Sequence, residues 1–123
     1  MANSKNMNIF IKRAYEKPDL NDGLRILVDR LWPRGLSKAD AKIDVWLKSV
    51  APSNDLRKWY QHDVQKWDEF KKRYFAELDR EKEAVNELFE YVKKGKVTFL
   101  YSAKESLKNN ATALKEYVGS ALS

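Results

Sequence analysis

Three charged residues that could bind a ligand or take part in catalysis follow a short apolar run, Ile26-Leu27-Val28, in the first third of the chain. Asp29 and Arg30 come directly after this run, and Arg34 follows four residues later. A charge beside a buried strand is costly unless it is paired or lies in a solvated cleft. Two interpretations are open. Either Asp29 forms an internal ion pair with a nearby Arg or Lys, or Arg30 and Arg34 hold a carboxylate or phosphate while Asp29 orients one of them.

A second group of polar side chains follows the apolar segment 96–101. It consists of Tyr101, Ser102, Lys104 and Asn109. Asn109 precedes a predicted helix, whose unpaired N–H groups and positive dipole end attract anions. The loop has no glycine, and neither GxxxxGKS/T nor GxGxxG occurs, which argues against nucleoside triphosphates and dinucleotides. A helix cap in a solvated loop is the favoured interpretation of Asn109 and Asn110.

The single histidine, His62, lies between Trp59 and Trp67. It is either a general acid or base, or a packed and hydrogen-bonded side chain, which is the more common outcome for one histidine among aromatic residues. Trp32 is a candidate pocket wall, whereas the other three tryptophans are expected mostly in the core.

These residues together define a hypothetical site where two strands end, because ligands of open parallel sheets bind beyond the carboxyl ends of the strands. If the protein is an enzyme, Asp29 or His62 is the candidate base and Tyr101 the candidate acid. The candidate ligand-binding residues are Arg30, Trp32, Arg34, Ser102, Lys104 and Asn109. The expected ligand is a small anion, such as a phosphorylated compound. This hypothesis requires Arg34 and Lys104 to lie on the same face.

The elements that must position this site indicate an α/β domain. Segments 7–15, 24–32 and 96–101 have the patterns of strands, the last two buried on both faces. Helical periodicity runs from about 63 to 94, with a kink or break allowed at 80–83, and a final helix begins at Asn109 or Asn110.

Strands separated by helices favour a short, mostly parallel sheet in a three-layer domain that covers 1–123. The link between the first two strands is short, so an antiparallel hairpin is an alternative for that pair. Segment 42–50 is ambiguous, because its apolar residues fit either a strand or a helix.

The composition excludes several kinds of site. The chain has 123 residues, no Cys and one His, which excludes disulfides, a thiolate nucleophile and zinc bound by Cys or by several His. No metal and no cofactor is predicted. Net charge is +6, and residues 1–60 hold 12 Lys or Arg against 7 Asp or Glu. With no apolar segment of about 18 residues and no run like that of a signal peptide, we expect a cytoplasmic protein that does not enter a membrane.

The run Leu27-Val28-Asp29-Arg30-Leu31-Trp32-Pro33-Arg34-Gly35 resembles the YeaO-like branch of the domain-of-unknown-function 488 family. The resemblance continues through Ile43–Leu47, Trp59 and His62-Asp63, and resumes at Leu100–Lys104. It implies a parallel arrangement of the first two strands but no established activity. Distant branches carry a Cys in the loop after the last strand, and this chain has none there, so thiol chemistry does not carry over.

Two other functions remain open beside the binding of a small anion. A nucleic-acid-binding module would use a continuous positive face with Lys12, Arg13, Arg25 and Lys38. A partner-binding domain would use exposed Trp or Tyr side chains as anchors.

Overall fold

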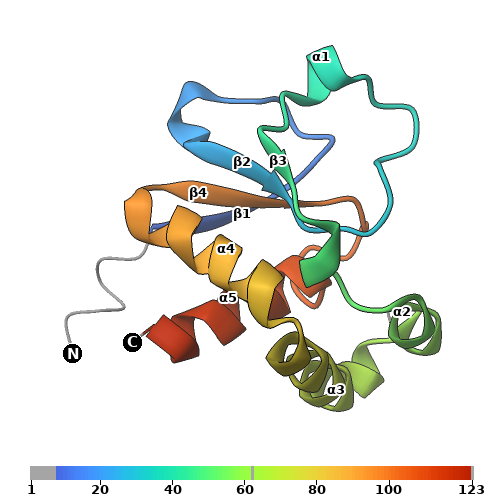
Figure 1. Cartoon of the computed structure of the whole chain (residues 1–123). Coiled ribbons are helices and arrows are strands. Elements are labelled where there is room, and N and C mark those ends of the chain that lie inside the picture. Colours follow the sequence, from blue (N-terminus) through green and yellow to red (C-terminus); the bar gives the residue numbers. More distant parts are fainter. Residues whose placement is uncertain (1–7, 62, 123) are drawn as a thin grey trace.

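The computed structural model describes residues 8–61 and 63–122, and it contains one sheet of four parallel strands (Figure 1). The strands are β1 (Ile9–Arg13), β2 (Leu24–Leu27), β3 (Val45–Trp46) and β4 (Val97–Tyr101). Their order across the sheet is β1-β4-β2-β3. The α/β class is therefore confirmed, and the hairpin alternative is wrong. The chain segments β1 and β2 are not neighbours, because β4 pairs in parallel with both of them.

The two predicted helical segments are present, and the first of them, 63–94, is interrupted once. The helices are α1 (Lys38–Ala41), α2 (Asn54–Tyr60), α3 (Trp67–Arg80), α4 (Lys82–Lys94) and α5 (Asn110–Leu122), with 3-10 turns η2 (Leu20–Asp22), η3 (Lys48–Val50) and η4 (Val64–Lys66). The predicted stretch 63–94 is thus η4 followed by two helices. The backbone leaves helical geometry at Glu81 (φ −99°, ψ 58°), where the apolar stripe weakens. No helix within residues 8–61 and 63–122 is apolar and long enough to cross a membrane.

The ambiguous segment 42–50 holds a strand and a turn. Its first part forms the short edge strand β3, and its second part forms η3. The strand interpretation therefore holds for Val45–Trp46 only, and the helical one for a single 3-10 turn at Lys48–Val50.

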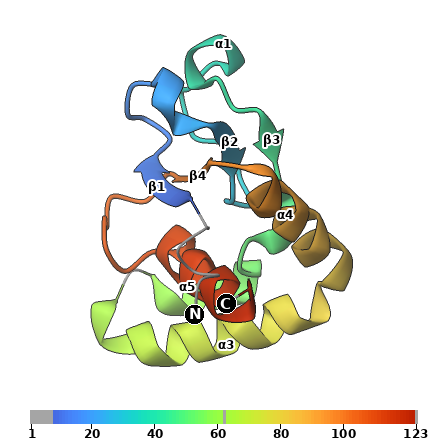
Figure 2. The same cartoon turned by 90° about the vertical axis from the view of Figure 1, so that its left-hand side faces the viewer.

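One face of the sheet carries the main core, under α3, α4 and α5 (Figures 1 and 2). Side chains alternate along a strand, so Val97, Phe99 and Tyr101 of β4 point to this face. The apolar sides of the helices meet them, with Tyr74 of α3 and Leu88 of α4 completely buried. This packing fixes the position of β4, and with it the segment that leaves its carboxyl end.

The opposite face is covered by a thinner layer, made of the chain between β2 and β3 together with α1 (Figure 2). A second, smaller core forms there around Ala14, Leu27 and Leu100. Trp32 and Trp46 pack on it edge to face, with ring centroids 5.4 Å apart. The sheet therefore lies between two layers of unequal thickness, and Trp32 stays partly exposed at the border of the thin one.

Candidate binding site at the strand ends

Asp29 joins three elements at the carboxyl edge of the sheet. Its Oδ2 accepts hydrogen bonds from the Ser102 backbone N–H (2.9 Å) and the Ser102 hydroxyl (2.7 Å). Its Oδ1 accepts one from the Asn110 amide (2.9 Å), which also donates to the Val28 carbonyl (3.1 Å). The end of β2 is thereby tied to the end of β4 and the first turn of α5. Within the described residues no Lys or Arg forms an ion pair with Asp29, so the internal ion pair is wrong.

Arg30 points away from Arg34. Its guanidinium donates to the carbonyls of Pro52 (Nε, 3.2 Å) and Ala51 (Nη2, 3.1 Å), and it lines a separate hollow beside Glu77. The expected pair of arginines on one anion is therefore not formed. Residue spacing does not determine which way a guanidinium turns after a strand ends. Arg30 instead fixes the segment that brings Pro52 to the site.

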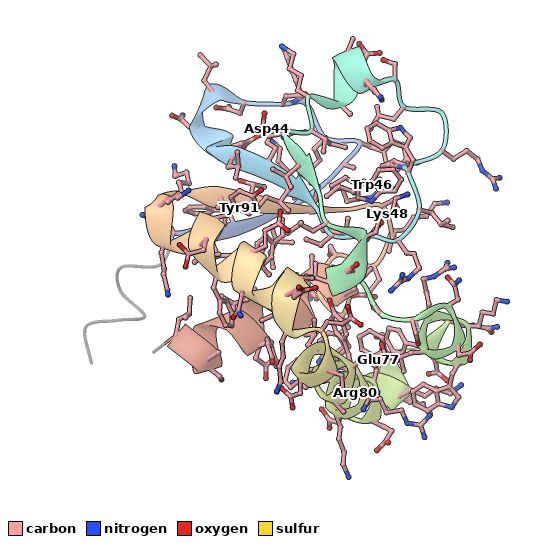
Figure 3. All side chains as sticks on the ribbon, in the orientation of Figure 1. Asp44, Trp46, Lys48, Glu77, Arg80 and Tyr91 are labelled. Atoms are coloured by element: carbon pink, nitrogen blue, oxygen red, sulfur yellow. The ribbon has the colours of Figure 1, made fainter. Side chains whose placement is uncertain are left out.

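Glu77 of α3 holds the same segment from the helix side (Figure 3). Its carboxylate accepts hydrogen bonds from the Ser53 backbone N–H (2.8 Å) and hydroxyl (2.6 Å). The Ser53 oxygen in turn accepts from the Leu56 N–H (3.1 Å) and caps α2. The start of α2 is thus fixed, and with it the orientation of Tyr60 at the other end of this helix.

A cavity of about 140 Å³, here called the inner pocket, lies between these elements. It is lined by Asp29, Leu31, Pro52, Arg57, Tyr60, Phe70, Ser102, Ala103, Asn109 and Asn110. The Tyr60 ring stacks on Phe70 with centroids 4.3 Å apart, and the Tyr60 hydroxyl donates to the Lys108 carbonyl (2.8 Å). Burial, together with the nearby Glu105 and Asp63 carboxylates, raises the pKa of Tyr60 to about 12. Its hydroxyl therefore keeps its proton at neutral pH.

An open depression of about 800 Å³, here called the outer groove, adjoins the inner pocket. It is lined by Arg13, Tyr15, Leu31, Trp32, Arg34, Ser102, Ala103, Lys104 and Glu105. The two hollows share Leu31, Ser102 and Ala103. Arg34 and Lys104 both line the groove, so the requirement that they lie on one face is met.

The backbone that carries Arg34 is well fixed, although its side chain is exposed. The Leu36 N–H donates to the Pro33 carbonyl (3.3 Å) across a turn in which Gly35 adopts φ 79°. This left-handed conformation favours glycine. The Tyr15 hydroxyl donates to the Arg34 carbonyl (2.8 Å), and Trp32 Nε1 donates to the Leu36 carbonyl (2.6 Å).

The cationic heads of Arg34 and Lys104 are unused by the fold. Neither makes a hydrogen bond or an ion pair to any side chain or carbonyl within residues 8–61 and 63–122. Both residues are exposed. These two cations are therefore available to a ligand in the outer groove.

Arg13 is a site residue that the sequence analysis assigned only to a nucleic-acid face. Its guanidinium donates to the carbonyls of Ala103 (Nε, 2.8 Å) and Ser102 (Nη2, 2.9 Å) and lies 4.8 Å from the centre of the Tyr15 ring. One feature of the sequence could have placed Arg13 at this edge of the sheet. Arg13 ends the first strand, and in a parallel sheet that end lies at the same edge as the other carboxyl ends.

Three further residues were predicted for the site, and the structure describes two of them. Tyr101 is buried in the main core, where burial and the Glu16 carboxylate raise its pKa, and it lines neither hollow. Asn109 caps α5, accepting from the Thr112 N–H (3.0 Å), which confirms the cap. Its solvated setting was wrong, because Asn109 is buried and lines the inner pocket. His62 lies outside the described residues.

The face proposed for nucleic acid contains residues that the fold already uses. Lys12 (3.1 Å) and Arg25 (2.5 Å) both form ion pairs with Asp22. Arg25 is 4% exposed and also donates to the carbonyls of Ala41 and Lys42. Arg25 therefore contributes nothing to a positive surface. Among the residues described, no three His, Asp or Glu side chains lie close enough together to hold a metal ion.

The fold and the strand-end hollows define a small α/β domain with a ligand-sized depression at the carboxyl edge of its sheet. The chain belongs to the DUF488 proteins described as the inactive DUF488-N3 subclade, whose family model matches residues 8–123.

Two curated relatives are similar over most of their length. The chain is 42% identical over 114 residues to the uncharacterized protein YeaO of Escherichia coli (strain K12), covering 93% of this chain and 99% of that protein. It is 39% identical over 106 residues to an uncharacterized protein of Mycobacterium tuberculosis (strain ATCC 25618 / H37Rv), covering 86% and 89%. These descriptions name no ligand and no reaction. No solved structure matches the chain.

Proposed function

We propose that this protein binds a small anionic molecule, such as a phosphorylated metabolite, across the inner pocket and the outer groove. The observation that carries the proposal is the pair of unused cations, Arg34 and Lys104, on one groove. Arg13 adds a third positive charge, and Glu105 is the single carboxylate in the lining of the outer groove. Cations gathered in a depression attract anions and hold phosphate or carboxylate oxygens by charge-assisted hydrogen bonds.

Two features favour binding without chemical conversion. The Asp29 carboxylate, the candidate base, already accepts three hydrogen bonds, and Tyr101, the candidate acid, lines neither hollow. The family model is described as an inactive subclade, which speaks against conversion and names no ligand. We further expect this binding to occur in the cytoplasm, since a chain without cysteine suits a reducing compartment.

The test is thermal denaturation of the pure protein with inorganic phosphate, sugar phosphates, nucleoside phosphates, citrate and short oligonucleotides. A ligand present at about 100 times its dissociation constant stabilises the folded state by roughly 2.7 kcal/mol, which raises Tm by several degrees in a domain of this size. We expect such a shift with a small anion. It should be much reduced in Arg34→Ala and in Lys104→Ala.

Lys115→Ala and Lys94→Ala are the matched controls, because both lysines are exposed and lie outside the lining of the two hollows. They remove the same net charge and should keep the shift. Equal losses in all four variants would mean that only net charge matters. A shift with oligonucleotides alone would replace the proposal by a nucleic-acid-binding function, and no shift with any compound would refute it.

A further inference from the structure

Neither hollow is sufficient alone for a metabolite-sized ligand. Small-molecule sites usually measure about 300–1,000 Å³ and enclose most of the ligand. The inner pocket, at about 140 Å³, is smaller than this range, and the outer groove is large but open. Since they share Leu31, Ser102 and Ala103, a ligand that crosses this border fills both. The ligand should therefore have two chemically distinct ends.

Most polar side chains of the inner pocket wall direct their donors at the protein itself. The exception is Arg57, an exposed side chain whose guanidinium donates one N–H to Asn54 Oδ1 (3.0 Å). The Ser102 hydroxyl donates to Asp29, and the Asn110 amide donates to Val28 and Asp29. The Tyr60 hydroxyl donates to Lys108. The Asp29 and Asn110 side-chain oxygens each keep capacity to accept a further hydrogen bond, because a carbonyl or carboxylate oxygen has two lone pairs. This wall therefore suits a ligand group that donates hydrogen bonds.

An anionic group is disfavoured at the half-buried wall of the inner pocket, because it would lie beside the Asp29 carboxylate, whereas the cation of the lining, Arg57, is exposed. Leu31, Pro52 and the stacked rings of Tyr60 and Phe70 provide apolar surface instead. Aromatic and apolar walls accept a flat ring well. A flat ring with an amino group meets both requirements, since its faces contact apolar walls and its N–H groups point to the spare acceptors.

The outer groove has the opposite character. Arg34 and Lys104 offer N–H donors that no described residue accepts, and Arg13 adds positive charge beside the Ser102-Ala103 border. An Arg and a Lys on one anion is a common arrangement for phosphate.

From these two halves we infer that the ligand is a phosphate ester of a flat, amino-bearing nitrogen heterocycle, with the ring in the inner pocket and the phosphate in the outer groove. The inference rests on the proposed function and adds the class of the ligand and its direction in the site. Nucleoside monophosphates are the simplest probes of this chemistry.

The experiment is isothermal titration of the full chain with intact ligands and with their parts. Adenosine and cytidine 5′-monophosphates are compared with the two nucleosides and with ribose 5-phosphate. Each monophosphate should bind at least about tenfold tighter than either part, because its two ends fill both hollows. Inosine 5′-monophosphate should bind about tenfold more weakly than adenosine 5′-monophosphate, since it places a carbonyl where an amino group would meet the Asp29 side of the pocket.

Two variants separate the halves of the site. Lys104→Ala should lower the affinity for the monophosphates and for ribose 5-phosphate by a similar factor. It should leave the affinity for the nucleosides unchanged. Leu31→Ala should weaken the binding of the monophosphates and nucleosides more than the binding of ribose 5-phosphate, which meets Leu31 only from the outer groove. Leu31 is 60% exposed, so its truncation should leave the fold intact. Lys115→Ala should change no affinity.

Monophosphates that bind no tighter than ribose 5-phosphate would overturn the inference while the proposed anion site stands. Equal affinities for the adenosine and inosine compounds would overturn the assignment of the amino group. If neither ribose 5-phosphate nor any monophosphate binds, both the inference and the proposed function fail.

Discussion

The charged residues near the strand ends fall into two groups with different roles. Arg13, Asp29 and Arg30, here called the bracing residues, direct their polar atoms at backbone groups of distant segments or at side chains that the fold positions. Arg34 and Lys104 make no such bond within the described part of the chain. The first group shapes the site, and the second group is exposed to whatever enters it.

The difference follows from burial. The three bracing residues are half-buried, whereas Arg34 and Lys104 are exposed, although Lys104 is no farther from the end of its strand than Arg30. A half-buried charge must find a partner, because isolation from water is costly. Arg34 lies in a turn, and Lys104 lies in the loop after β4, where water solvates a charge. Burial thus separates the charges that the fold uses from the two that it leaves unused.

The largest effect should come from removing the Asp29 carboxylate. Asp29→Ala leaves three hydrogen-bond donors of Ser102 and Asn110 without their acceptor, and each unsatisfied donor costs about 1–3 kcal/mol when it stays out of water. We expect the free energy of unfolding to fall by about 3 kcal/mol, measured by urea denaturation. Asp68→Ala, at an exposed position in the first turn of α3, is the control and should cost at most about 1 kcal/mol. Similar losses in the two variants would remove Asp29 from the bracing group.

A smaller, pH-dependent effect should come from Asp22, which pairs with Lys12 and Arg25 on the opposite edge. Burial raises the pKa of Asp22, but hydrogen bonds from the Asp19 backbone, Lys12 and Arg25 outweigh it and leave the pKa below its usual value. A lowered folded pKa gives stability that is present above the unfolded value, about 3.9, and is lost as pH falls toward the folded pKa. Asp22→Asn should therefore be less stable than the parent at pH 7 and approach it in acid.

Chemical denaturation from pH 7 to pH 3 measures this convergence. Glu69→Gln is the comparison, because a hydrogen bond from Arg73 lowers the pKa of Glu69 on the exposed side of α3. Solvent and salt weaken such an exposed pair. The difference in stability between Glu69→Gln and the parent should therefore change much less with pH, and not at all in high salt. Parallel pH curves for Asp22→Asn and the parent would contradict the role given to Asp22.

The smallest effects on stability should come from the two unused cations. Arg34→Ala and Lys104→Ala should each change the free energy of unfolding by less than about 0.5 kcal/mol, since no bond within the described residues is lost. Arg13→Ala, which loses its bonds to the Ser102 and Ala103 carbonyls, should cost about 1–2 kcal/mol. The same urea titration checks all three. A loss for Arg34→Ala as large as that for Arg13→Ala would end the distinction between the groups.

The meeting of the strand ends, where the candidate site lies, was predictable from the sequence. Two apolar segments, each followed by polar residues, indicate parallel strands whose carboxyl ends share an edge, and this brought Arg34 and Lys104 together correctly. The apolar period of 97–101 and of the helices depends only on local pattern, which explains why the α/β class was also correct.

The roles of single side chains were not predictable in the same way. Arg30 was expected beside Arg34, but the carbonyls of Ala51 and Pro52, brought near by tertiary packing, hold it instead. Asn110 was taken for part of a solvated cap, and its contact with Asp29 depends on how α5 packs against β2. The sequence pattern predicted either a kink or a break at 80–83 and did not decide between them. A weak apolar stripe is the same for a bent helix and for two helices.

The central place of β4 has a consequence for how the protein is made. Leu24 of β2 and Ile9 of β1 both align with Val97, so neither N-terminal strand has a central neighbour until the last quarter of the chain has been synthesised. The first ninety residues leaving a ribosome therefore have only the short β2–β3 pairing, and their apolar strands stay open to aggregation or chaperone binding until β4 is made. Translation must reach the final helix before the lining of the inner pocket is complete.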